Sequence, residues 1–116
     1  MATLKSYVDE EVAQFKSARA SHCTEDAWAA LERAHIFSQP DAWLHTAMHW
    51  HMLRYGLETG DHREVLGQFV RILVAGVGSA LGKAPAGNTG RSNVGIMQIM
   101  PVPPEIAAKL DAARKG

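Results

Sequence analysis

Apolar residues recur at every third or fourth position through four successive stretches of the chain. This is the period of an amphipathic α-helix, because a strand would alternate every second residue. The first helix is expected from about Leu4 to Ala18, the second begins at Thr24, and the third ends near Leu57. A fourth helix follows, and a short terminal helix is expected from Pro103 to about Arg114.

Polar residues, glycine and proline indicate where these helices begin and end. The stretch Ser38-Gln39-Pro40-Asp41 has the form of a capping box with proline in the first turn, and predicts the start of the third helix. Thr59-Gly60 is expected to end that helix, because glycine is favoured just past a helix C-terminus. Asp61 and Glu64 form another cap-like pair at the start of the fourth helix.

The fourth helix shows a continuous apolar face. Its apolar positions are Leu66, Phe69, Val70, Leu73 and Val77. The most apolar stretch, from Val65 to Leu81, is interrupted by Gln68 and Arg71 and is barely long enough to span a bilayer. We therefore expect a helix buried in a protein core, and no membrane partner.

The connections between the four helices are short, so successive helices should pack antiparallel. The fold class expected is all-α: a four-helix bundle-like domain with an extended Pro/Gly-rich segment, about Val94 to Pro101, and a short C-terminal helix. A tetratricopeptide-like helical pair is a second interpretation, but no second copy of such a repeat is visible. Residues 1–116 should form a single domain, since 116 residues leave no room for another core.

Composition and charge exclude several classes of function. Twelve Lys plus Arg balance twelve Asp plus Glu, so no basic excess is available to neutralise phosphates, and no nucleic-acid partner is expected. The single cysteine, Cys23, cannot form an internal disulfide, and the first residues lack the apolar run of a secretory signal. A cytoplasmic location is therefore expected.

Six histidines are many for so short a chain, and two lie with two methionines on one stripe of the third helix. His45, Met48, His49 and Met52 stand at i, i+3, i+4 and i+7. Arg54 lies about half a turn from that stripe and should face solvent, so the two histidines are expected to point inward. Two imidazoles one turn apart can bind one transition-metal ion without distorting the backbone.

The second helix supplies a matching pair, Glu32 and His35, at the i, i+3 spacing used by carboxylate-bridged metal sites in helix bundles. Ten residues separate His35 from His45, which is enough for the chain to turn and bring both to one level of an antiparallel pair. Glu11, on the apolar face of the first helix, is a further candidate oxygen ligand. A full di-iron site would need more inward carboxylates, and the fourth helix offers none.

The ligand types narrow the metal only partly. Three imidazoles, from His35, His45 and His49, suit zinc, copper, nickel or iron, whereas thioethers from Met48 and Met52 would favour copper. The alternative interpretation has no metal: inward histidines can hydrogen-bond to a carboxylate or a carbonyl, and methionine is ordinary core filling.

Other candidates are weaker. His51 and His62 are expected to be structural or exposed. His22-Cys23 pairs a thiol with an imidazole, but no orienting group for nucleophilic catalysis is visible. The loop Gly87–Arg91 has glycines and a cation that could hold an anion, yet it does not match a phosphate-binding loop and more often is only a turn.

Several motifs together resemble a known family. They are Ala34-His35-Ile36 with Gln39, the run from His45 through His49 to Arg54, Gly78-Ser79, Gly87 to Arg91, and Met100-Pro101 with Pro103. The pattern is similar to the bacterial family catalogued as domain of unknown function 3703, over about Ala29 to Ile106 and without the first helix. The resemblance implies a small helical bacterial protein with no established activity.

Three functions remain open on sequence alone. The first is a metal-binding protein that handles copper or zinc, with iron or nickel as alternatives. The second is a metal-dependent enzyme in which Glu32 or Glu11 acts as the base. The third is a non-catalytic helical interaction module, such as a homodimer, whose histidines are structural, satisfied polar groups of the core. The aromatic stripe of Trp43 and Trp50 on the third helix is expected to form core or a subunit interface.

Overall fold

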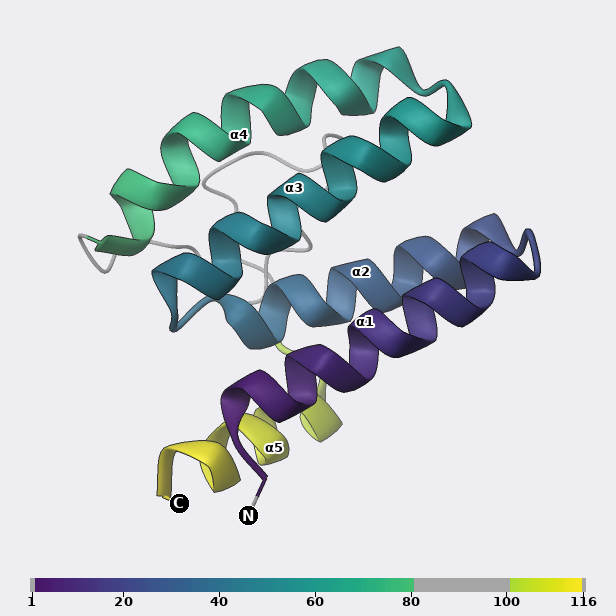
Figure 1. Cartoon of the computed structure of the whole chain (residues 1–116). Coiled ribbons are helices and arrows are strands. Elements are labelled where there is room, and N and C mark those ends of the chain that lie inside the picture. The colour runs from purple at the N-terminus through teal and green to yellow at the C-terminus, as the bar shows by residue number, and fades with distance from the viewer. Residues whose placement is uncertain (1, 81–100, 116) are drawn as a thin grey trace.

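A computed structural model of the chain describes residues 2–80 and 101–115, which contain five α-helices (Figure 1). They are α1 (Leu4–Ala20), α2 (Thr24–Ser38), α3 (Ala42–Thr59), α4 (His62–Ala80) and α5 (Pro104–Lys115). Within these described ranges no residue is in a strand, so the predicted all-α class is confirmed. The Gly87–Arg91 loop and all of the expected extended segment except Pro101 lie outside the described residues.

Each of the helices α1 to α4 packs side by side and antiparallel with the next one in sequence (Figure 1). Helices α1 and α2 form one hairpin, α3 and α4 form a second, and the packing of α2 against α3 joins the two. Helix α5 packs on α1 and α2, so α4 lies at the opposite edge of the stack, against α3 (Figure 1). None of the described helices has both the length and the apolar character needed to cross a bilayer.

The turn between α2 and α3 differs from the predicted capping box. Asp41, and not Ser38, caps α3: its carboxylate accepts the backbone N–H of Trp43 at 2.9 Å and of Leu44 at 3.1 Å. Ser38 is the last residue of α2, buried, with its hydroxyl donating to the carbonyl of His35 at 2.7 Å. The prediction placed the helix start three residues too early, because the serine bonds backward to its own helix and not forward.

Two hydrophobic clusters hold the helices together. One joins α1, α2 and α3 through Phe15, Ala27, Trp28, Ala30, Leu31, Met52 and Tyr55. The other joins the same helices to α5 through Val8, Ala34, Ile36, Phe37, Met48 and Ile106. Neither cluster includes any of the α4 side chains that the structure describes, from His62 to Leu73, so their contact with α3 has a different chemical character.

The inward face of α4 is polar, which reverses the prediction from its apolar spacing. Glu64, Gln68 and Arg71 are only 2%, 0% and 7% exposed. Four of the five predicted core residues instead face outward, with Leu66 68%, Phe69 57%, Val70 45% and Leu73 67% exposed, and the side chain of the fifth, Val77, lies outside the described part of the structure. Helical periodicity identifies two opposite faces of a helix but not the one that packs on a neighbour, and here the polar face packs.

Gly56 allows α4 to approach α3 closely at the start of this polar contact. A Cβ atom at Gly56 would lie 3.3 Å from the Cγ2 of Val65 and 3.6 Å from the Cβ and Cγ of Glu64. Four residues later Gly60 ends α3 in the left-handed conformation, with φ of 73°, as the Thr59-Gly60 pair predicted. The two glycines thus set the short, tight hairpin that brings Glu64 against α3.

Candidate metal centre

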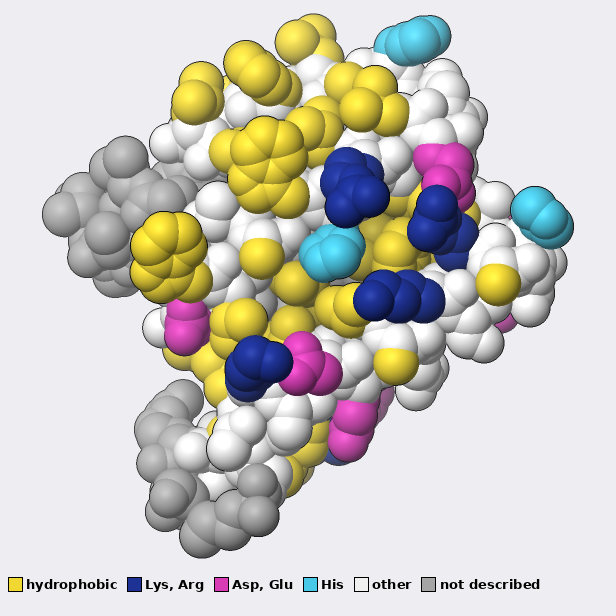
Figure 2. Space-filling model, in the orientation of Figure 1, with side chains coloured by type: hydrophobic (Ala, Val, Ile, Leu, Met, Phe, Trp, Pro, Cys, Tyr) yellow, Lys and Arg dark blue, Asp and Glu magenta, His cyan; other side chains and the backbone are white. Residues whose placement is uncertain are grey.

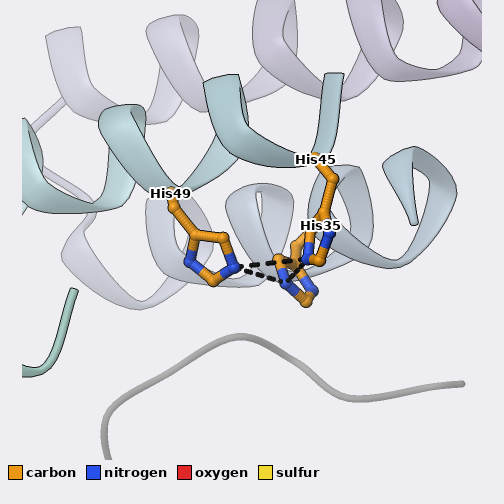
Figure 3. A group of neighbouring side chains, drawn as sticks. All are labelled: His35, His45 and His49. Atoms are coloured by element: carbon orange, nitrogen blue, oxygen red, sulfur yellow. Dashed lines mark hydrogen bonds between the residues drawn. The ribbon is translucent and has the colours of Figure 1, made fainter. Parts of the chain in front are cut away.

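Helices α2 and α3 bring three imidazoles to one buried point (Figure 3). The Nε2 atom of His35 lies 2.9 Å from that of His45 and 3.1 Å from that of His49. The Nε2 atoms of His45 and His49 are 3.3 Å apart. All three side chains are buried, at 2% to 5% exposed, as the inward stripe predicted.

The triangle of nitrogen atoms has the size of one face of a metal coordination sphere. At metal–nitrogen distances near 2.0 to 2.1 Å, ligands at 90° are about 2.8 to 3.0 Å apart, and tetrahedral ligands about 3.3 to 3.4 Å apart. The observed separations, 2.9 to 3.3 Å, fall between these two limits. Three facial imidazoles therefore fit one ion and leave at least one coordination position for another ligand.

The protonation chemistry of imidazole also favours a cation at this point. A neutral imidazole carries one proton, so each ring has one donor and one acceptor nitrogen. Three Nε2 atoms in mutual contact cannot all be satisfied by hydrogen bonds among themselves, because at one contact or more either two lone pairs or two N–H groups must face each other. A metal ion accepts all three lone pairs at once.

The second nitrogen of His49 is held by a side chain of α4. Its Nδ1 lies 2.7 Å from the Oε1 atom of Gln68, and the Nε2 of Gln68 donates to the Oε2 of Glu64 at 2.7 Å. An ionised carboxylate only accepts hydrogen bonds, which turns the amide NH₂ of Gln68 toward Glu64 and its oxygen toward His49. His49 must then carry its proton on Nδ1, so its Nε2 lone pair faces the other histidines.

Sequence reasoning missed this part of the site. Glu64 was expected to belong to a helix cap, and α4 was expected to offer no inward carboxylate; both Glu64 and Gln68 are buried. Asp61 does cap α4, accepting the backbone N–H of Glu64 at 3.0 Å, but the Glu64 side chain points to Gln68. The i, i+4 spacing of Glu64 and Gln68, with Arg71 next on the same face, was the available signal.

Burial keeps two of the histidines neutral. Desolvation lowers the pKa of His45 to about 4. Desolvation also lowers the pKa of His49 to about 4, outweighing the hydrogen bond to Gln68, which acts to raise it. The Arg71 guanidinium lowers the pKa of His49 further, and the Glu64 carboxylate opposes this. Neutral imidazole is the form that binds a metal, so no proton has to be removed at neutral pH.

These pKa values predict that the metal-free protein loses stability in mild acid. The unfolded chain protonates its histidines near pH 6.5, whereas folded His45 and His49 resist protonation down to about pH 4. The unfolded state therefore binds more protons between these limits, and the free energy of unfolding falls as pH drops, by up to about 2 kcal/mol per histidine at pH 5. Urea unfolding with a chelator at pH 7, 6 and 5 measures this, and a His45→Gln/His49→Gln variant should show a flatter dependence. An equal pH dependence of the free energy of unfolding in both proteins would contradict the lowered pKa values of His45 and His49.

The other four predicted ligands are not part of the cluster of three imidazoles. The carboxylate of Glu32 is half-buried and is not among the clustered ligand atoms. Glu11 is buried on α1, and its Oε2 forms an ion pair with the Nε of Arg33 at 2.5 Å. Met48 and Met52 pack within the two hydrophobic clusters. Metal ligation by the four residues stays a prediction.

The weaker candidates are apart from the three histidines. His62 is exposed at the start of α4, and His51 is half-buried with its ring edge-on to Phe15, 6.2 Å between centroids. The thiol of Cys23 donates to the carboxylate of Asp26 at 3.0 Å. None of the three belongs to the metal-ligand cluster found among the described residues.

Comparison with known proteins gives one match. The family described as "Protein of unknown function (DUF3703)" matches residues 2–110. The match is longer than the resemblance over Ala29–Ile106 suggested, because it includes α1. No curated protein and no solved structure matches the chain.

Proposed function

The chain belongs to the DUF3703 family, whose description states no activity, and we propose that it is a transition-metal-binding protein whose ligands are His35, His45 and His49. One observation carries the proposal: three buried Nε2 atoms lie 2.9 to 3.3 Å apart and face a common point. Histidines that only stabilise a core satisfy their nitrogens with separate partners, whereas these three share one position. That arrangement suits one ion.

We assign zinc or copper to this site. Imidazole nitrogen is a borderline ligand that both ions prefer, and copper(II) and zinc bind nitrogen sites more tightly than the earlier first-row divalent ions. Glu64 adds a buried negative charge two hydrogen bonds removed from His49, through Gln68, which complements a cation at the histidines. The coordination position that three histidines leave open suits reversible transfer of the ion to another ligand.

Titration with zinc(II) and copper(I) of the wild-type protein and a Met48→Leu/Met52→Leu variant tests the proposal and the role of sulfur together. We expect one zinc ion per chain and similar affinities, within about threefold, in both proteins, because leucine replaces methionine at nearly equal volume in the hydrophobic clusters. Circular dichroism is the folding control.

A loss of copper(I) affinity alone in the double variant would show that the thioethers are ligands and would favour copper(I). A wild-type protein that takes up neither metal at one ion per chain contradicts the proposal.

A further inference from the structure

The second helical hairpin carries a large apolar surface. Every large hydrophobic side chain that is exposed in the described part of the chain lies on α3 or α4. They are Trp43, Trp50 and Leu57 on α3, and Leu66, Phe69, Val70 and Leu73 on α4. Figure 2 shows hydrophobic side chains gathered over α4 and the adjoining part of α3.

The spacing of these residues is that of helices that pack against other helices. Trp43, Trp50 and Leu57 are seven residues apart along α3, so they form one stripe. On α4 the exposed residues Leu66, Phe69, Val70 and Leu73 stand at i, i+3, i+4 and i+7. Another helix can pack on either stripe. Among the described helices only α3 packs closely on α4.

We propose that this apolar surface of α3 and α4 is the interface of a homodimer, in which the two α3–α4 hairpins form a four-helix bundle. This proposal is independent of metal binding. A two-helix layer with one apolar side lacks the second layer that completes a helix bundle, and the identical hairpin of a second copy supplies it. A two-fold axis lets each copy present the same surface to the other.

The chemistry of the surface favours a second copy. The outward stripe of α4 from Leu66 to Leu73 carries no charged residue, so it selects an uncharged, apolar partner surface and matches its own composition. An apolar surface from one helix seam pairs well with an identical seam, as in coiled coils.

The extent of the surface is also that of an interface. Seven large side chains, each 45% to 87% exposed, offer on the order of 1,000 Å² of accessible area. The largest apolar patch of a typical monomer is about 300 to 600 Å², and a standard interface buries about 800 Å² per partner. The exposed residues of α3 and α4 therefore supply enough area for a stable dimer.

Sedimentation equilibrium of the full chain, with and without chelator, tests the proposal. We expect a mass of twice 12.6 kDa for the wild-type protein in both conditions. A Leu66→Glu/Leu73→Glu variant should dissociate at least about a hundredfold more readily, because two carboxylates per chain would be buried in the apolar interface. Both leucines are exposed in the single chain, so its fold should tolerate the change.

The matched control is Ala13→Glu/Ala20→Glu, which places two carboxylates at the same seven-residue spacing on exposed positions of α1. It should remain a dimer. Trp50→Glu, on α3, is a second interface variant and should also dissociate. It tests the interface if the Leu66→Glu/Leu73→Glu variant loses its helical structure.

A wild-type chain that is monomeric at about 50 μM overturns the proposal. A dimer that persists in both interface variants overturns it as well. Wild-type chains that are monomeric in solution but sediment with phosphatidylcholine vesicles would show that a lipid surface covers α4 instead, which also overturns it. Loss of zinc uptake in a dimeric protein bears on the metal site alone, so the two proposals fail separately.

Discussion

Replacing His49 with alanine is expected to abolish metal binding at one ion per chain. His49 supplies one of the three Nε2 atoms, and it is the histidine whose tautomer is fixed by Gln68. The two remaining imidazoles would hold an ion with far less affinity, by a factor of at least about one hundred, because a nitrogen ligand and its hydrogen bond to Gln68 are lost together. Isothermal titration of the metal-free variant with zinc(II) measures the loss.

The matched control is His62→Ala, because His62 is exposed at the start of α4 and apart from the clustered imidazoles. It should bind zinc as the wild-type protein does. Circular dichroism and urea unfolding of both variants separate a lost ligand from a lost fold. Equal zinc affinity in the two variants would move the site away from His49.

Replacing Gln68 with methionine is expected to weaken zinc binding about 10- to 100-fold while leaving all three histidines in place. Methionine keeps the length of the side chain but removes the acceptor for the His49 Nδ1–H and the donor to Glu64. His49 is then free to adopt the tautomer in which its Nε2 carries the proton and cannot ligate. The buried Glu64 carboxylate also loses a partner, which lowers the free energy of unfolding by about 1 to 3 kcal/mol.

A readout of the tautomer distinguishes positioning from general destabilisation. The imidazole ¹⁵N shifts of His49 should report an Nδ1–H ring in the wild-type protein and a mixture of tautomers in Gln68→Met. Glu64→Gln should retain more affinity, since an amide oxygen can still accept from Gln68. Gln14→Met on α1 is the control for the side-chain change. An unchanged tautomer and affinity in Gln68→Met would reduce Gln68 to a packing role.

The helices and the inward direction of the histidines were predictable because both depend on local spacing. Helix α1 begins at Leu4, as apolar periodicity indicated, α2 begins at Thr24, as its acidic first turn indicated, and α3 ends at the Thr59-Gly60 pair. Burial of His45 and His49 followed from their position opposite the lone cation of α3, and Arg54 is indeed exposed. Each of these predictions needs only the 3.6-residue period and the ends of one helix.

The face of α4 that is buried was not predictable from the residues of α4 alone. A stripe containing Leu66 and Leu73 predicts a buried face, because most helices of globular domains turn their apolar side toward the core. The structure buries Gln68 and Glu64 instead, since His49 on α3 offers Gln68 a hydrogen-bond partner and Gln68 in turn donates to Glu64. Which face packs depends on the surface of the neighbouring helix, and that surface is assembled from residues distant in sequence.

The sequence by itself determined the all-α class, the number and approximate ends of the helices, and the pairing of His45 with His49 on one stripe. Only the tertiary structure decided that the Nε2 of His35 meets both at 2.9 to 3.1 Å, and that Gln68 and Glu64 orient His49. The physical reason is the range of the interactions. Helix formation and capping are set by residues a few positions apart, whereas the level at which α2 meets α3, and the face that α4 turns inward, are fixed by packing between helices.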